Sequence, residues 1–279
     1  MISRLARALG GIADVISPPT CPACGADTHD RGALCADCFA EMPFLSGALC
    51  SGCARPAPLL SDDEAYRCTA CLEVPHRFTE ARAAALYGGT ARRMVLALKH
   101  ADRLDLAPLM ARWMLRGAAD LVTDADLVVP VPLHWRRRLA RRANQSAEIA
   151  RHLVGQAGLP PRALRPGVLV RTRHTPSQGG FDRAARAANL VGAFALGRRA
   201  QRSIRGRRIL LVDDVLTTSA TLDAAAGVLL AGGARRVDAA VFAVVEGRDD
   251  PYVARSAGAG ADMDDPADGS GPGPGRAKD

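Results

Sequence analysis

The sequence is poor in aromatic residues, almost without lysine, and free of long apolar runs. Aromatic residues make up 4% of the 279 residues. Because single-stranded nucleic acid is held partly by stacking on such side chains, this scarcity weighs against a base-stacking protein. Before the C-terminal tail the only lysine is Lys99, so the basic charge is carried by arginine. No apolar run approaches the length of a membrane-spanning helix, and we expect no transmembrane segment.

Two further absences narrow the class of protein. The first 15 residues hold only a broken apolar stretch, which predicts no secretory signal and places the protein in the cytoplasm. Residues 3–15 of this stretch nevertheless have apolar positions at helical spacing, so we expect a short amphipathic helix there that docks on the protein body. Neither a P-loop nor a Rossmann fingerprint is found around the most chemically distinctive stretch, residues 209–230, which excludes both common nucleotide-binding motifs there.

Charge is unevenly distributed along the chain. The 37 basic and 29 acidic residues give a net charge of +8 and a pI near 9.4, which suggests anionic partners. Residues 249–279 contain seven aspartates against three basic residues, a net −4, so the rest of the chain carries +12. This Gly-, Pro-, Ala- and Asp-rich tail is expected to be disordered.

No cysteine is left unpaired in the sequence pattern. All eight occur as Cys-x-x-Cys pairs separated by 10, 11 and 14 residues, close to zinc-ribbon spacing. Two such turns supply the four thiolates of a tetrahedral zinc site, which predicts two structural Zn²⁺ ions. Disulfides suit a secreted chain and a thioredoxin-like pair is single, so both alternatives are weaker. The spacing favours sequential over interleaved sites without deciding between them; the predicted ligands are Cys21, Cys24, Cys35, Cys38, Cys50, Cys53, Cys68 and Cys71.

The central stretch combines a buried strand, two acids and a hydroxyl-rich loop. The apolar run 209–212 is typical of a strand buried on both faces of a parallel sheet, and it is expected to end at Asp213 and Asp214. Loop amides, hydroxyls and the start of the next helix then form a site for a phosphate monoester. Ordinary helix capping explains one hydroxyl, but not two acids followed by several hydroxyls.

A ribose 5-phosphate fits this pattern, because its hydroxyls can donate to the carboxylates while its phosphate lies on the loop. The stretch resembles the PRPP motif of type I phosphoribosyltransferases, and a Mg²⁺ ion shared with pyrophosphate would screen the charge. Ser219 stands where that motif has glycine. The predicted PRPP-binding residues are Asp213, Asp214, Thr217, Thr218, Ser219, Ala220 and Thr221.

The remaining chain predicts further strands and helices around this site. A strand is expected at 79–88, helices at 90–101 and 104–121, an edge strand at 127–133, a helix capped by Asn144, and strands at 168–170, 192–196 and 237–245. In the type I transferase fold, the loop after the edge strand takes the pyrophosphate. The resemblance assigns this side to Lys99, Pro130, Val131, Pro132 and Arg136.

Residues 171–180 form a polar, Gly-terminated segment typical of a lid over an active site. We assign Arg173, His174 and Gln178 to closure over the reacting centre or the bound ligand.

Several motifs together resemble the ComF family of competence-associated, phosphoribosyltransferase-like proteins. They are the four cysteine pairs, Leu98-Lys99, the Pro-Val-Pro turn, Asn144-Gln145, the segment from Arg171 to Gln178, Asn189 to Phe194, and the central VDDVLTTSAT. The resemblance implies an α/β fold with a type I phosphoribosyltransferase-like parallel sheet flanked by helices behind a small zinc-ribbon domain. We predict an N-terminal helix at 1–17, a double zinc ribbon at 18–75, the transferase-like domain at 76–247 and the tail at 248–279.

Two functions remain open. The first is PRPP binding with Mg²⁺, either alone or followed by transfer of the phosphoribosyl group with release of pyrophosphate. The second, which the family resemblance implies, is a non-catalytic role in handling single-stranded DNA during uptake, beside a competence helicase or translocase.

Overall fold

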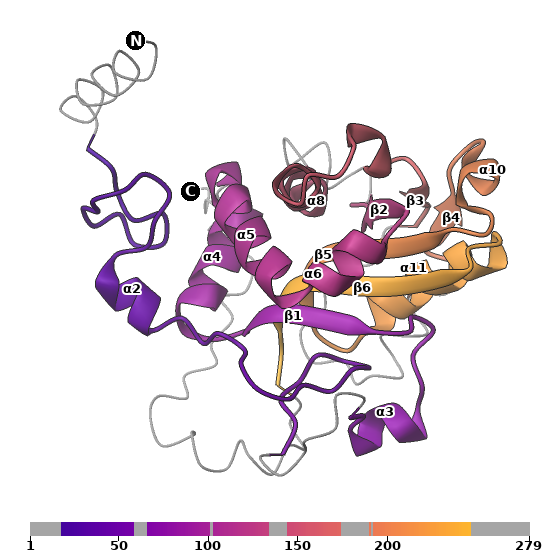
Figure 1. The fold of residues 1–279 in the computed structure, drawn as a ribbon, viewed down its shortest axis with the longest axis horizontal. Helices are drawn as coiled ribbons and strands as arrows, with labels where there is room; N and C mark the ends of the chain where they lie inside the picture. Colours follow the sequence, from indigo (N-terminus) through magenta and orange to yellow (C-terminus); the bar gives the residue numbers. More distant parts are fainter. Residues whose placement is uncertain are drawn as a thin grey trace, which may run out of the picture. The chain divides into compact units, whose positions relative to one another are not determined.

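A four-stranded parallel sheet in the order β1-β6-β5-β2 forms the centre of the protein (Figure 1). The computed structural model describes residues 18–58, 66–100, 103–133, 144–173, 190 and 192–246. Strand β5 pairs in parallel with β6 on one side and with β2 on the other, which leaves β1 and β2 at the edges. The strands are β1 (Ala81–Leu86), β2 (Leu127–Pro130), β5 (Arg208–Leu216) and β6 (Arg236–Val244).

Side chains that alternate along the central strands build a core on each face of the sheet. On β5, Leu210 and Val212 belong to one core, whereas Ile209 and Leu211 belong to the other. This alternation follows from the two-residue period of a strand, and it explains why the run 209–212 is apolar throughout. The first core is covered by α4 (Gly89–His100), η1 (Leu104–Leu106), α5 (Ala107–Gly117), α6 (Ala119–Asp124) and α8 (Gln145–Gln156).

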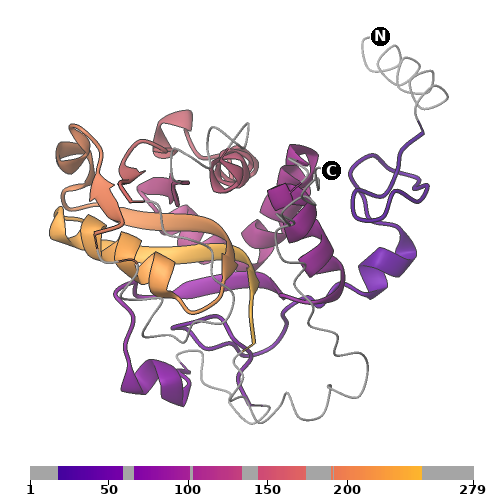
Figure 2. The same ribbon diagram turned by 180° about the vertical axis from the view of Figure 1, so that it is seen from behind.

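The opposite face is covered by α11 (Ala220–Ala231) and by a second, smaller sheet. Figure 2 shows α11 lying along the strands on this side. Strands β3 (Leu169–Arg171) and β4 (Phe194–Leu196) pair with each other in antiparallel fashion and do not join the main sheet. Short helices α10 (Ala200–Ile204) and η2 (Pro161–Ala163) complete the transferase-like part.

The prediction of one continuous helix at 104–121 is wrong. The structure divides this segment into η1, α5 and α6, with a break at Ala118, whose φ and ψ are −133° and 25°. A Cβ atom on Gly117 would lie 3.3 Å from the carbonyl oxygen of Ala83, so the end of α5 passes close to β1. The predicted apolar face is nevertheless buried, since Leu106, Met110 and Met114 are at most 1% exposed.

Both edges of the sheet are covered by other parts of the chain. Along β1, the Leu45 N–H donates to the Ala84 carbonyl at 3.0 Å, and the Leu86 N–H donates to the Pro43 carbonyl at 2.9 Å. Along β2, the Arg165 N–H donates to the Val128 carbonyl at 2.9 Å. Covered edges of this kind prevent pairing with other chains.

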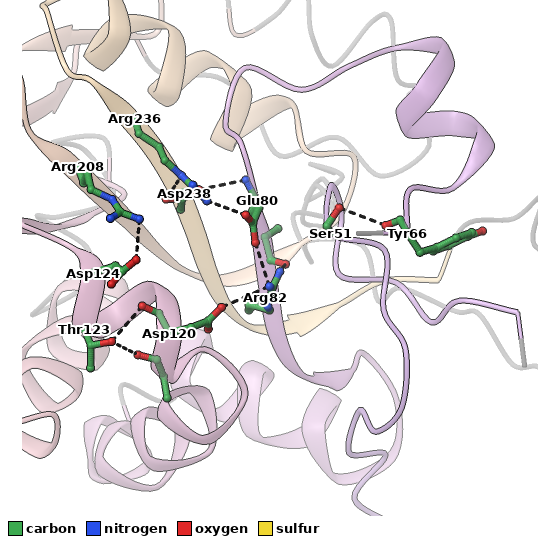
Figure 3. Close-up of polar contacts among 12 residues, drawn as sticks. Ser51, Tyr66, Glu80, Arg82, Asp120, Thr123, Asp124, Arg208, Arg236 and Asp238 are labelled. Carbon is green, nitrogen blue, oxygen red and sulfur yellow. Dashed lines mark hydrogen bonds and ion pairs between the residues drawn. The ribbon is translucent and has the colours of Figure 1, made fainter. Parts of the chain in front are cut away.

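A network of charged side chains joins the amino ends of the strands (Figure 3). Arg236 donates from Nε to both oxygens of Asp238, at 2.9 and 2.8 Å, and pairs with Glu80 at 2.7 Å. Arg208 pairs with Asp124 at 2.7 Å. Burial raises the pKa of Asp238, while Arg236 opposes this shift. The charges at this end satisfy one another, whereas the carboxyl ends of the strands carry the predicted site.

The segment that contains the cysteines includes two short helices, α2 (Ala36–Ala40) and α3 (Thr69–Glu73). Contacts divide the chain into Met1–Val245 and Glu246–Asp279, so the cysteine segment and the sheet belong to one unit. The predicted helix at 3–15 and the tail from 249 onward lie outside the described residues. Within the described part of the chain, no helix is long and apolar enough to cross a membrane.

Candidate functional site

The eight cysteines gather in two groups of four, in the sequential order that their spacing favours. In each group the sulfur atoms all lie within 4.8 Å of one another. The Sγ atoms of Cys24 and Cys35 are 3.6 Å apart, and those of Cys53 and Cys68 are 3.8 Å apart. A tetrahedral zinc ion with bonds of about 2.3 Å places its sulfur ligands roughly 3.8 Å apart, so the residues fit Zn²⁺. The first cluster is Cys21, Cys24, Cys35 and Cys38, and the second is Cys50, Cys53, Cys68 and Cys71.

The two clusters differ in exposure. In the second cluster Cys50, Cys53 and Cys71 are at most 3% exposed, and the Cys68 N–H donates to the Cys50 sulfur at 3.2 Å. In the first cluster Cys24 is exposed. A closed shell of four thiolates leaves no position for a substrate, so both clusters suit structural zinc.

Strand β5 continues beyond the end predicted for it. The expected strand stops at Val212, but β5 runs to Leu216 because its pairing with β6 persists as far as Val244. On the other side β2 ends at Pro130, opposite Val212. Asp213 and Asp214 therefore lie within the strand, but past the end of its β2 neighbour.

Two helices and strand β5 itself contribute to the environment of the two acids. Lys99, near the end of α4, places its Nζ 3.1 Å from Oδ1 of Asp214. Ser146, in the first turn of α8, donates its hydroxyl to Oδ1 of Asp213 at 2.8 Å. The backbone N–H of Asp214 donates to the same oxygen at 3.0 Å. Lys99, which the resemblance placed on the pyrophosphate side, thus lies against the acidic pair.

The environment of Asp213 favours its neutral form. Burial, together with the adjacent Asp214 carboxylate, raises the pKa of Asp213 to about 7. The hydrogen bond from Ser146 and the charge of Lys99 act in the opposite direction. Asp213 is therefore poised to change protonation when a cation or a hydroxyl-bearing ligand arrives.

The predicted phosphate loop leads directly from β5 into α11. Thr217 is exposed, Thr218 and Thr221 are half-buried, and Ala220 is the first residue of α11. Ser219 precedes the helix in the left-handed conformation, with φ 63° and ψ −10°, and makes no side-chain capping bond. This is the backbone that favours glycine, which explains why a glycine is usual at the equivalent place in the PRPP motif. The helix has 12 residues, and its first N–H groups face the loop.

The Pro-Val-Pro turn lies beside the acids. The Val131 N–H donates to the Val212 carbonyl at 2.9 Å, which holds the turn against β5. Asn144 occupies the N-cap position of α8 as predicted, but its side chain makes no capping bond. Its Nδ2 instead donates to the Val131 carbonyl at 3.2 Å, because that carbonyl lies beyond the last pair of β2 and β5. The start of α8 is thereby tied to the turn.

Of the predicted lid at 171–180, the structure describes only residues 171–173. Arg173 is exposed and follows β3, and the Thr172 hydroxyl donates to the Gly192 carbonyl at 2.8 Å across the base of the segment. His174 and Gln178 lie outside the described residues, as does Arg136 on the pyrophosphate side. Their assignments stay predictions.

Comparisons with known proteins agree with the two halves of this architecture. A family model described as a double zinc ribbon domain matches residues 12–72. A second, described as a phosphoribosyl transferase domain, matches residues 143–259, which include the acids and the loop.

Curated relatives match up to 61% of this chain. "DNA utilization protein YhgH" of Salmonella typhi is 30% identical over 176 residues, which cover 61% of this chain and 74% of that protein. The protein of the same name from Escherichia coli K12 is 30% identical over 180 residues, with the same coverage. "Competence protein F" of Haemophilus influenzae is 33% identical over 98 residues, which cover 35% of this chain and 41% of that protein. The chain belongs to the ComF family.

In this ComF family chain, the two matching family models and the observed sheet confirm the predicted fold class, and the ribbon model with the two cysteine clusters supports the predicted structural zinc. The parallel sheet flanked by helices is that of a phosphoribosyltransferase domain, and a zinc ribbon precedes it. The sequence patterns did not indicate two polar contacts of this ComF protein, that of Ser146 with Asp213 and that of His76 with Cys71. Ser146 gave no signal because serine is common in the first turn of a helix, and His76 follows the last cysteine pair without matching any ligand spacing.

Proposed function

We propose that the protein binds PRPP together with Mg²⁺ at the carboxyl ends of β5 and β2. The observation that carries this proposal is the acidic pair Asp213 and Asp214, held by Lys99 and Ser146 directly before the loop that opens α11. In open α/β sheets ligands bind at this edge, and a helix start accepts phosphate. The match of this region to a phosphoribosyl transferase domain supports the same ligand class.

The surroundings of the acids suit a ribose better than a bare phosphate. Two neighbouring carboxylates would repel phosphate, but they accept hydrogen bonds from the 2′ and 3′ hydroxyls of a ribose whose phosphate lies on residues 217–221. Lys99 now neutralises Asp214 at 3.1 Å. When the hydroxyls and Mg²⁺ take over this screening, Lys99 becomes available to the pyrophosphate beside Pro130, Val131 and Pro132.

Calorimetric titration with PRPP and Mg²⁺ tests the proposal. The double variant Asp213→Ala, Asp214→Ala should lose the binding heat that the wild type shows. Asp124→Ala is the matched control, because this carboxylate belongs to the network at the amino ends of the strands. Equal heats for the wild type and the double variant would exclude the assignment.

Lys99 offers a sharper test of the orientation of the ligand. Lys99→Met should weaken PRPP binding more than ribose 5-phosphate binding, because only PRPP carries the pyrophosphate that the lysine would contact. An equal loss for both ligands would place Lys99 on the ribose side, where it serves Asp214 alone.

If the protein is catalytic, the reaction is displacement of pyrophosphate at C1 of the ribose through an oxocarbenium-like state. The protein would supply positioning and charge, with Arg173, His174 and Gln178 closing over the site. We expect slow turnover, because no side chain stands out as a base for the acceptor. Pyrophosphate release measured over a set of nucleobases and small amines tests this, and rapid base-dependent release would contradict it.

The words DNA utilization and competence in the names of the relatives favour a second candidate, a role in handling DNA. The family resemblance implies that this would be single-stranded DNA beside a helicase or translocase. The net charge of +12 before the tail favours contact with phosphates. Against this, two arginines of the basic stretch 198–208 already pair with acids, Arg207 with Asp126 at 3.0 Å and Arg208 with Asp124 at 2.7 Å.

A gel-shift series over increasing salt, with and without PRPP, separates the two roles. Binding of single-stranded DNA that weakens steeply with salt and ignores PRPP favours the nucleic-acid role. The absence of a shift at low salt removes it.

A further inference from the structure

Two residues beside the second cysteine cluster contact the predicted phosphate loop and the first turn of the helix that follows it. The first contact is made by Arg55, two residues after Cys53. Its Nη2 donates to the carbonyl of Thr217 at 3.2 Å, and its Nε donates to the carbonyl of Val245 at 3.2 Å. One guanidinium group thus joins the cluster to the first residue of the loop and to the end of the last strand.

The second contact is a chain of side chains from a cysteine to the first turn of α11. Nε2 of His76 lies 3.5 Å from the sulfur of Cys71, and Nδ1 of His76 lies 2.9 Å from Oδ2 of Asp223. The histidine side chain is 3% exposed, and its ring stacks on Phe78 with centroids 4.7 Å apart. The ring is therefore held between the thiolate and the carboxylate with little freedom to turn.

Asp223 is bound on both of its oxygens by the segment that follows the cluster. Oδ1 accepts from the Arg77 N–H at 2.8 Å, while Oδ2 faces His76. Its own N–H donates to the carbonyl of Ser219 at 2.8 Å, which closes the first turn of α11. A Cβ atom on Gly227 would lie 2.8 Å from Nη1 of Arg77, so this arginine crosses the helix closely at a residue without a side chain.

These contacts connect residues around the cluster to both ends of the segment 217–223. Arg55 holds the Thr217 carbonyl at the start of this segment, and His76 with Arg77 holds the Asp223 carboxylate at its end. Asp223 is also an acid in the first turn of the helix whose start is expected to bind phosphate. Its contact with His76 directs the carboxylate toward the ribbon. Outer contacts of a zinc thiolate orient the ligand as well, so the coupling acts in both directions.

We propose that zinc in the second cluster positions the phosphate loop, so that zinc binding there and sugar-phosphate binding at residues 217–221 strengthen each other. His76 and Arg55 are the positioning residues. The inference rests on the proposed function for the identity of the ligand, but not for the mechanical link. The first cluster has no corresponding contact with this loop among the described residues; its outer partner Arg93 joins Cys38 to Glu41 and Thr90.

Binding of ribose 5-phosphate, measured calorimetrically, tests the coupling. This probe lacks the pyrophosphate that would itself chelate zinc. His76→Gln and Arg55→Met should each weaken binding roughly fivefold or more, the usual scale of coupling between two sites. Arg67→Met is the matched control, because Arg67 belongs to the same ribbon and donates to the Thr79 carbonyl at 2.9 Å, away from the loop. The control should bind like the wild type, and metal analysis should find two zinc ions in all variants.

Arg55→Met keeps the test decisive if His76→Gln loses zinc or fails to fold, since the Arg55 side chain donates to the backbone carbonyls of Thr217 and Val245 and the substitution leaves the backbone beside Cys53 in place. Equal affinities in the wild type, His76→Gln and Arg55→Met would overturn the coupling while the proposed function stands.

Hydrogen exchange separates failure of the coupling from failure of the proposed function. Without any ligand, the amides of residues 217–224 should exchange faster in His76→Gln and Arg55→Met than in the wild type and Arg67→Met. If the wild type binds no ribose 5-phosphate but this pattern appears, the ligand assignment is wrong and the mechanical link is right. Unchanged exchange in both variants overturns the link itself.

Discussion

Replacing Ser219 by glycine should make the protein more stable. Ser219 has φ 63° and is 6% exposed, so a buried Cβ atom sits in the left-handed region. This conformation costs a residue with a side chain about 1–2 kcal/mol. Glycine removes that cost but adds about 0.4–1 kcal/mol of freedom to the unfolded chain. At the middle of both ranges the net gain in the free energy of unfolding is about 0.8 kcal/mol, which corresponds to a rise of about 2–3 °C in Tm.

Thermal and urea unfolding of three variants measure this effect. Ser219→Ala keeps the Cβ atom and should give no gain, which isolates the backbone contribution. Arg199→Gly is a matched control at an exposed position with φ 66°, also directly before a helix, and it should gain a similar amount. If Arg199→Gly gains stability while Ser219→Gly loses it, the serine hydroxyl contributes more than the backbone strain costs, and the reasoning is wrong.

Three further predictions concern the metal, the acids and the charge network. Zinc should leave the first cluster before the second during chelator titration, because Cys24 is exposed; simultaneous release would contradict this. The pKa of Asp213, raised to about 7 from 3.8, gives stability that is full at low pH and lost as pH rises through about 7. The free energy of unfolding of the wild type, measured in urea relative to that of Asp213→Asn, should therefore fall between about pH 3.8 and about pH 7. A difference that does not change with pH would refute this prediction. Arg236→Met should lower the free energy of unfolding by about 2–3 kcal/mol, because Asp238 loses its cation. The double variant with Asp238→Asn should recover most of this loss in urea unfolding, and no recovery would show that the pair is not the cause.

Local patterns determined much of the fold and of the candidate site. The run 209–212 predicted a strand buried on both faces, because only apolar side chains satisfy two cores at once. The Cys-x-x-Cys spacing predicted two zinc sites, since each turn presents two thiolates from neighbouring residues. The resemblance to the PRPP motif could be recognised because the acids, hydroxyls and helix start follow one another in the chain. Each of these features depends on residues within a few positions of one another.

Contacts between distant segments were decided only by the tertiary structure. The extension of β5 to Leu216 depends on its pairing with β6, and the break at Ala118 depends on the close approach to β1. The partners of the acids come from two different helices, with Lys99 on α4 and Ser146 on α8. His76 and Asp223 are 147 residues apart in the chain but 2.9 Å apart in space. A sequence pattern records which side chains are neighbours along the backbone, whereas these pairings arise because packing both faces of one sheet brings separate segments to the same edge.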